Sequence, residues 1–339
     1  MSELAALAAD HGLEVLLTTA SAVAGGRSIG LVDPEGSLLA GAPVPPGGLL
    51  LPVRLHESIV GHVVYDAGVP EDVAVLVCTS LELAIRGARH HASLERAANE
   101  LDIGRDIQRS LLPRHFPEVE GWRFAADYEP AREVGGDLYD VFRLRGDRAD
   151  VALLIADVTG KGVPAALLMA DTKALLHAAA DNADDPADAL GRVNRILAVE
   201  RRSSLFVTAA LAAVDADTGD VRLASAGHEA PLVIRADGRL EAIEARGAIL
   251  GAFAGAAYEP ALCRVGPGEV VVLYTDGITD TRDAAGIFYG EARLRGVLAE
   301  LAGASADEVR RAVVDDVRTF RGEADLFDDL TVLIAERES

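Results

Sequence analysis

Four acidic positions share one setting, the end of an apolar stretch with the composition of a β-strand. Asp157 closes VALLIAD, Asp276 closes VVVLYTD, and Asp137 opens DLYDVF after two glycines. The adjacent pair Asp328 and Asp329 stands directly before LTVLIAE. Aspartate is almost never fully buried without a partner, so these side chains need a cation, a helix N-terminus or a substrate close by.

The chemistry that this set predicts is metal binding. Scattered acids usually decorate solvent-exposed faces, but repeated placement at strand ends predicts that the carboxylates meet at a common edge. Carboxylates brought together repel one another, and hard divalent ions with oxygen ligands, Mg²⁺ or Mn²⁺, relieve that repulsion. Two such ions can hold and activate a water molecule for in-line attack on phosphorus.

Two basic residues near these acids are candidate substrate-binding residues. Lys161, in ADVTGKG, and Arg132, in PAREVGGD, could each attract a substrate phosphate. The alternative for Lys161 is a solvated lysine in a turn. The alternative for Arg132 is an ion pair with Glu133. The segment around Lys161 is not a Walker A loop, because Ile155 stands where the first glycine of G-x-x-x-x-G-K is required.

Composition restricts the class of protein. The chain has 339 residues, of which half are apolar, and a formal net charge of −22 from 54 acidic and 32 basic residues. Such an excess of acids argues against nucleic-acid and anionic membrane partners, whose binding depends on Lys and Arg. The N-terminus lacks the positive charge of a signal peptide, and no apolar run is long enough to span a bilayer, so we expect a cytoplasmic protein.

The two cysteines, Cys78 and Cys263, lie in apolar-leaning stretches and are predicted to be free, buried thiols. Neither begins a C-x5-R motif, because Ala84 and Glu269 stand six residues after them. A cysteine-based phosphatase mechanism is thereby excluded.

Three zones position these residues. Residues 1–70 form a small module with strands predicted in SIGLVDPEGSLLAG and LLLPVRLHESIVGHVVYD. Residues 71–112 are predicted to be helical, between Pro70 and Pro113. This stretch is either a connecting helix that pairs with its copy in a homodimer, or one or two ordinary packing helices with breaks at Gly87 and Gly104.

Residues 113–339 contain nine strand candidates with hairpin-length links, which favours antiparallel pairing. Two helical groups, at 163–199 and 294–320, interrupt the strands. Strands with segregated helices predict an α+β layered domain and not a doubly wound one.

The motifs that carry the chemistry also occur in a known order. PAREVGGDLYDVF, IADVTGKGVPAALLMA, FVTAALAAVD, ASAGHEAPLV, LYTDGITD and DDLTVLIAE together resemble the SpoIIE-type branch of the metal-dependent (PPM) serine/threonine phosphatases. The resemblance covers about residues 105–339. It implies an α-β-β-α sandwich of two mostly antiparallel sheets with two Mn²⁺ or Mg²⁺ ions between them, and a metal-activated water that attacks phosphoserine or phosphothreonine.

The resemblance also implies a role for each matching residue. Asp157 corresponds to the acid that bridges both ions, with the carbonyl of Val158 as the backbone ligand beside it. Asp137 corresponds to the carboxylate on one ion, and Asp276 to a ligand of the other. Asp157 and Asp137 are therefore the predicted catalytic pair.

The motif DDLTV leaves two candidates for the last ligand. Asp328, the first acid, matches the family position, and Asp329 is the alternative. We favour Asp328, on the expectation that strand alternation turns Asp329 away.

The N-terminal zone loosely resembles a shortened GAF-type sensor module, followed by its exit helix. Phosphatases of this branch act on phosphorylated STAS-domain anti-sigma-factor antagonists in bacterial partner-switching pathways, so the resemblance implies such a substrate. The alternatives are a catalytically inert signalling scaffold with the same fold and a hydrolase of small phosphoesters.

Overall fold

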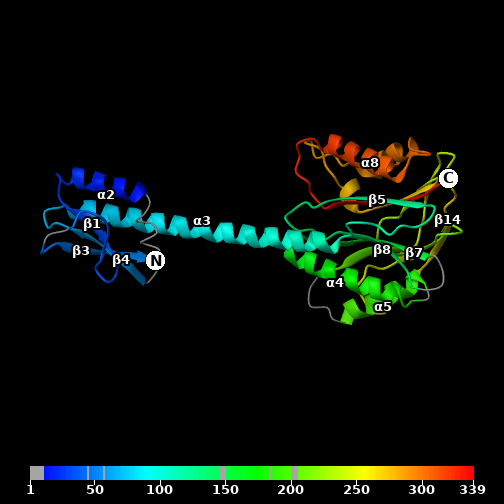
Figure 1. Cartoon of the computed structure of the whole chain (residues 1–339), viewed down its shortest axis with the longest axis horizontal. Helices are drawn as coiled ribbons and strands as arrows, with labels where there is room; N and C mark the ends of the chain where they lie inside the picture. Colours follow the sequence, from blue (N-terminus) through cyan, green and yellow to red (C-terminus); the bar gives the residue numbers. More distant parts are fainter. Residues whose placement is uncertain (1–10, 44–45, 56–57, 146–149, 184, 200–204) are drawn as a thin grey trace. The chain divides into compact units, whose positions relative to one another are not determined.

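The computed structural model describes residues 11–43, 46–55, 58–145, 150–183, 185–199 and 205–339. The chain divides into two compact units, Met1–Glu100 and Leu101–Ser339. The helix α3, Glu71–Leu111, is continuous from the first unit into the second, so neither Gly87 nor Gly104 breaks it (Figure 1). No described helix combines the length and apolar composition needed to cross a membrane.

The first unit is a four-stranded antiparallel sheet with helices packed on it. The strand order is β2-β1-β4-β3. The elements besides α3 are α2 His11–Val23, β1 Ile29–Val32, β2 Leu38–Gly41, β3 Leu49–Leu55 and β4 Ser58–Tyr65. In the turn between β1 and β2, the Asp33 carboxylate accepts the Ser37 backbone N–H at 2.7 Å. Leu17 of α2, Val63 of β4 and Leu81 of α3 are fully buried in its core.

The second unit is built on two five-stranded sheets. Their orders are β11-β10-β15-β16-β5 and β14-β9-β8-β7-β6, and the named strands within each sheet pair antiparallel. The strands are β5 Trp122–Glu129, β6 Leu138–Arg143, β7 Asp150–Val158, β8 Val207–Asp215, β9 Asp220–Ala226, β10 Leu232–Ile234, β11 Leu240–Ala242, β14 Ala261–Arg264, β15 Val270–Tyr274 and β16 Leu330–Arg337. A small separate ribbon joins β12 Arg246–Gly247 to β13 Tyr258–Glu259.

Helices cover the outer faces of both sheets, as Figure 1 shows. They are α4 Val163–Ala180, α5 Pro186–Val199, α6 Asp276–Thr279, α7 Gly290–Ala299 and α8 Ala306–Arg321. On β7, Leu154 packs toward α4 and α5, whereas Leu153 and Ile155 pack against the other sheet. This alternation separates three apolar cores and confirms the predicted α-β-β-α sandwich.

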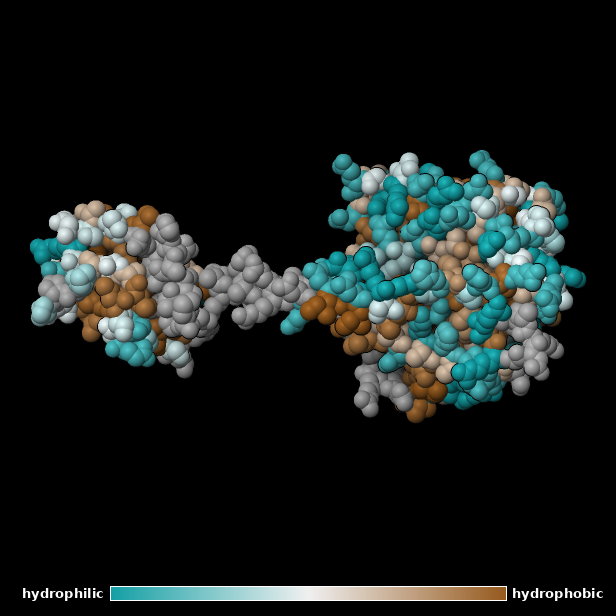
Figure 2. Space-filling view, viewed as in Figure 1, coloured by the Kyte–Doolittle hydropathy of each residue, from teal (hydrophilic) through white to brown (hydrophobic). Residues whose placement is uncertain are grey.

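The surface of this unit agrees with the excess of acids. On the face drawn in Figure 2 it is largely hydrophilic, with small apolar patches.

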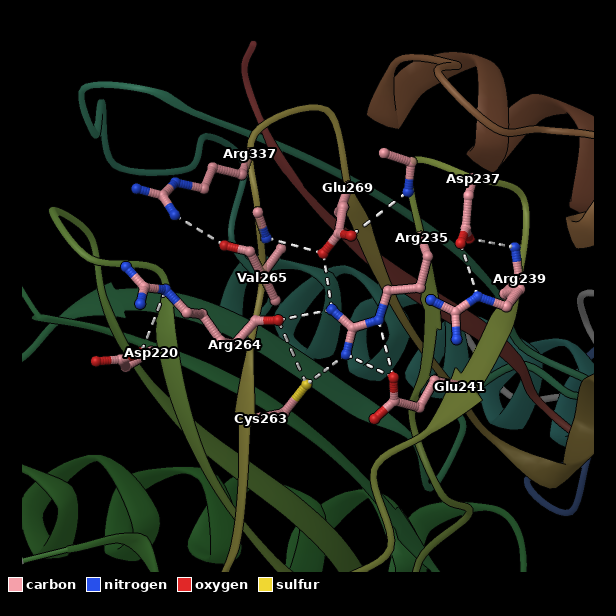
Figure 3. Close-up of polar contacts among 12 residues, drawn as sticks. Asp220, Arg235, Asp237, Arg239, Glu241, Cys263, Arg264, Val265, Glu269 and Arg337 are labelled. Carbon is pink, nitrogen blue, oxygen red and sulfur yellow. Dashed lines mark hydrogen bonds and ion pairs between the residues drawn. The ribbon is translucent and has the colours of Figure 1, made fainter.

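Cys78 is buried as predicted, but Cys263 is only partly buried on the edge strand β14. The prediction of a buried thiol at Cys263 is wrong because an edge strand is covered on fewer sides than a central one. Its sulfur lies beside the Arg235 guanidinium (Figure 3).

Candidate metal centre

Two predicted metal ligands lie opposite each other at one end of a sheet. The register of β6 and β7 pairs Leu138 with Ala156, so the next residues, Asp137 and Asp157, face each other across the strand pair. On β7, Leu153 and Ile155 point into the core between the sheets. By strand alternation Asp157 points to the same face of the sheet. Asp137 is 2% exposed, and Asp157 lies within hydrogen-bond reach of it.

The other sheet brings two threonines to the same place. β15 ends at Tyr274 and β16 begins at Leu330, and just beyond Tyr274 the Thr275 N–H donates to the carbonyl of Thr331 at 3.1 Å. Both hydroxyls donate to Oδ2 of Asp137, at 2.7 Å from Thr275 and 2.5 Å from Thr331. The buried carboxylate therefore links the two sheets.

Asp329 is the buried member of the adjacent acidic pair, with 6% exposed. Its Oδ1 accepts the Ala131 N–H at 2.8 Å and its Oδ2 accepts the Gly136 N–H at 2.5 Å. The expectation that alternation turns Asp329 away is wrong. Thr331 points at Asp137, and alternation from Thr331 returns Asp329 to the same side.

Asp328 lies at the rim of the site. Its side chain is 33% exposed, and its Oδ2 is 3.2 Å from Nζ of Lys161. It is also close enough to Asp157 and Asp276 to raise their pKa values. Its assignment as the ligand in preference to Asp329 stays a prediction.

Three glycines allow the backbone to approach these acids closely. A Cβ on Gly136 would lie 2.7 Å from the carbonyl oxygen of Val158. A Cβ on Gly135 would lie 2.2 Å from Oδ2 of Asp329, and one on Gly277 would lie 1.9 Å from the Asp329 carbonyl oxygen. Since real side chains do not tolerate such contacts, any larger residue would displace the loops that carry the acids.

Burial and mutual repulsion perturb the acids. The pKa of Asp137 is raised well above its usual range by burial and by the charges of Asp157 and Asp329. Burial, with the charges of Asp276 and Asp328, raises the pKa of Asp157 to about 7. The pKa of Asp276 is raised for the same reasons, burial first and then Asp328. The centre thus holds more negative charge than its own protein surroundings neutralise.

The donor set fits a hard divalent cation. Carboxylate oxygens and the Val158 carbonyl oxygen are the ligands that Mg²⁺ and Mn²⁺ prefer. Beside Asp137 and Asp329 lies the buried Tyr128 hydroxyl, which has no hydrogen-bond partner among the described residues. Among the residues that the structure describes, no three His, Cys, Asp or Glu side chains are already spaced around one ion.

The two predicted phosphate contacts lie in different settings. Lys161 is 25% exposed, pairs with Asp328, donates to the carbonyl oxygen of Phe327 and lies 4.3 Å from the centre of the Phe327 ring. The charge of Lys161 is therefore already paired with Asp328 at the rim of the site. Arg132 is exposed in the loop between β5 and β6. Both assignments as substrate-binding residues stay predictions.

Sequence reasoning missed Gln108, near the end of α3. Its buried side-chain amide donates to the Gly135 carbonyl at 2.6 Å, and its Oε1 accepts the Gly135 N–H at 3.0 Å. Lys173 of α4 donates to the carbonyl of Leu111, the last residue of α3, and pairs with buried Asp140 at 2.9 Å. The end of α3 is thus bonded to the loop that carries Asp137. No sequence signal identifies Gln108, because polar residues recur throughout this helix.

Comparison with known proteins agrees with this geometry. Protein IcfG of Synechocystis is 28% identical over 265 residues, which are 70% of this chain but only 41% of IcfG. Phosphoserine phosphatase RsbU of Bacillus subtilis is 27% identical over 303 residues, or 87% of this chain and 88% of RsbU. The SiaA-PP2C domain of Pseudomonas aeruginosa superimposes with a TM-score of 0.65 at 24% identity, over 73% of this chain and 99% of that domain.

The family model described as Stage II sporulation protein E (SpoIIE) matches residues 147–338. The match includes Asp157, Asp276 and Asp328, three of the acids that meet at the end of the sandwich. Because it covers more than half of the 339 residues, the chain belongs to the SpoIIE family.

Proposed function

We propose that this protein is a metal-dependent protein serine/threonine phosphatase. The observation that carries the proposal is the facing pair of buried Asp137 and partly buried Asp157 at the ends of β6 and β7, with pKa values raised by burial and repulsion. A protein gains nothing in stability from such a pair, so the arrangement is explained by a cation that the acids hold. The similarity to a phosphoserine phosphatase supports the reaction class.

The chain's own residues would divide the work as follows. Asp157, Asp137 and Asp276, with Asp328 or Asp329, would hold two Mn²⁺ or Mg²⁺ ions. When bound, such ions lower the pKa of a water and stabilise charge on a phosphoryl group. The Thr275 and Thr331 hydroxyls fix Oδ2 of Asp137.

The remaining atoms of the centre would assist in the same way. The Val158 carbonyl adds a neutral oxygen donor beside Asp157. Lys161 and Arg132 would attract the phosphate of the substrate, with Lys161 at the rim and Arg132 on the exposed loop.

The proposed substrate is a phosphorylated STAS-domain protein of a partner-switching pathway, and the similarity to RsbU along nearly the whole chain supports it. We propose the domain organisation predicted above: a GAF-like sensor at 1–70, a helical linker at 71–112 through which two copies form a homodimer, and a phosphatase domain at 113–339. The continuity of α3 supports the linker. The cytoplasmic location stays a prediction from the sequence.

Mn²⁺-dependent turnover tests the proposal. Wild-type protein should release phosphate from p-nitrophenyl phosphate and from phosphoserine peptides when Mn²⁺ is added, and Asp157→Asn should fall to the protein-free background. Titration calorimetry should show Mn²⁺ binding to wild type and its loss in Asp157→Asn. Asp171→Asn, an exposed acid on α4, is the matched control and should behave as wild type.

The results also separate the alternatives. Equal turnover by wild type and Asp157→Asn would refute the assigned centre. Peptide binding without turnover by either protein would favour the inert scaffold. Turnover of nucleotides in preference to phosphoserine peptides would favour a small-phosphoester hydrolase.

A further inference from the structure

An arginine held between two exposed aromatic rings lies next to the carboxylate centre. The guanidinium carbon of Arg282 is 4.3 Å from the ring centre of Phe288 and 4.8 Å from that of Phe327. The exposed fractions are 49% for Phe288, 54% for Phe327 and 60% for neighbouring Ile287. These four residues are called the Arg282 surface below.

The loop that presents this surface is organised by its own hydrogen bonds. Arg282 and Phe288 form an isolated antiparallel bridge. Inside it, the Asp283 carboxylate accepts the N–H groups of Ala285 and Ile287, both at 2.9 Å. A preorganised loop loses little conformational entropy when it binds a partner, so exposed apolar side chains on it are suited to recognition.

Among the described residues, the guanidinium of Arg282 contacts aromatic rings and forms no ion pair. In the part of the chain that the structure describes, no carboxylate lies within ion-pair distance of its guanidinium. Some other arginines of the described residues do have carboxylate partners; Arg293 binds Asp316, and Arg318 binds Glu129. An arginine fixed by ring contacts with its donors unused is ready to bind an anionic group.

The Arg282 surface is continuous with the proposed active site. The Phe327 ring that contacts Arg282 also contacts Lys161, which pairs with Asp328. Arg282 itself contacts none of the site acids among the described residues. Phe327 and Lys161 therefore link Arg282 to the acids of the site.

We propose that the Arg282 surface binds the segment of the protein substrate that flanks its phosphoserine, with an acidic side chain on Arg282 and an apolar side chain on Phe288 and Ile287. The proposal rests on the phosphatase function proposed above and adds the local sequence that the enzyme selects. Charge complementarity and continuity with the site identify the occupant. Exposed aromatic residues with arginine are typical of such binding surfaces.

Three probes test the proposal with Mn²⁺ present: p-nitrophenyl phosphate, a phosphoserine peptide flanked by glycine and serine, and phosphoserine peptides with Asp-Leu placed before or after the phosphoserine. Wild type should prefer one Asp-Leu peptide. In Arg282→Ala and Phe288→Ala, kcat/KM for that peptide should fall about tenfold, and turnover of p-nitrophenyl phosphate should stay within about twofold of wild type. Phe253→Ala, an aromatic side chain 56% exposed elsewhere, is the matched control and should change neither.

A binding measurement keeps the proposal independent of catalysis. The unphosphorylated Asp-Leu peptide, labelled for fluorescence anisotropy, should bind wild-type protein more tightly than Arg282→Ala by about tenfold. This result supports the surface even if no phosphatase activity is found. Equal peptide turnover and equal binding in wild type and Arg282→Ala would overturn the proposal. A parallel loss of p-nitrophenyl phosphate turnover would also overturn it, since it would place Arg282 on the phosphate itself.

Discussion

Acidic side chains are paired with arginine at one end of the sandwich, whereas at the other end they lie close together and repel one another. Strand β15 has Glu269 just before its first residue and Asp276 two residues after its last. Glu269 is 2.7 Å from Arg235, which also binds Glu241, and Figure 3 shows this network joining strands of both sheets. Burial alone would raise the pKa of Glu269, but the Gly266 backbone N–H and the Arg235 guanidinium together lower it. At the other end the pKa of Asp276 is raised, by burial and by Asp328.

This difference separates stabilisation from function within one fold. At the Arg235 end Glu269 and Glu241 both bind Arg235, so these charges hold strands together. At the carboxylate end Lys161 pairs with Asp328 alone, and burial leaves the repulsion of Asp137 and Asp157 in place. The protein tolerates that cost because the surrounding cores fix the strand ends.

Removing the guanidinium of Arg235 should have the largest effect on stability. Arg235→Met leaves Glu269 charged, 14% exposed and without its guanidinium, so the free energy of unfolding should fall by about 4 kcal/mol. Urea denaturation followed by circular dichroism measures it. Arg239→Ala, which removes an exposed arginine paired with Asp237, should cause no measurable change; an equal loss in both variants would deny that burial makes the difference.

Removing the charge of Asp157, which is repelled by neighbouring acids, should stabilise the metal-free protein. Asp157→Asn should raise the free energy of unfolding by about 2 kcal/mol above pH 7, because an amide in this position carries no charge to repel its neighbours. The folded pKa of about 7 exceeds the usual aspartate value, so the ionised group destabilises the fold progressively as pH rises from about 4 to about 7. The gain over wild type should therefore widen across that range and then level off.

Thermal melts in chelator at several pH values measure this gap. Asp171→Asn is the control, since that acid is exposed on α4. A gap that shrinks as pH rises would contradict the assigned repulsion.

Cutting the connection of α3 to the site should have an intermediate effect. Gln108→Leu leaves the buried N–H and carbonyl of Gly135 without their partner, which should cost about 1–2 kcal/mol of stability. Because Gly135 precedes Gly136 and Asp137, Mn²⁺ affinity measured by calorimetry should also fall several-fold. Gln108→Glu retains the acceptor for the Gly135 N–H and should recover part of the affinity. Unchanged Mn²⁺ affinity in Gln108→Leu would show that Gln108 only packs.

The smallest effect should come from a neutral donor at the carboxylate end. Thr331→Val removes one of two hydroxyls that bind Oδ2 of Asp137 and keeps the shape of the side chain. Stability should fall by about 1 kcal/mol, and Mn²⁺ affinity should fall several-fold because the ionised form of Asp137 loses a donor. Tighter Mn²⁺ binding in the variant would show that the hydroxyl competes with the ion.

Local pattern predicted most of this molecule. Hairpin-length links and segregated helices predicted a layered α+β domain, and the family resemblance implied the sandwich. Proline boundaries placed α3 to within a residue at each end. The phase of alternation at Asp328 and Asp329 could not be read, because it depends on which side Thr331 faces once β15 and β16 pair. Cys263 also differed, since its burial depends on the position of β14 at the edge of a sheet.

The sequence by itself determined the family, the sandwich and the acids that define its centre, because each motif carries its own strand or turn and the residue beside it. Tertiary structure alone decided how those acids are balanced: which carboxylate receives threonine hydroxyls, which receives backbone N–H groups, and which stays uncompensated. It also decided that Gln108 reaches Gly135 and that Arg282 lies between two rings. Such pairings join residues far apart in the chain, and their energies depend on distance and burial, which no local pattern encodes.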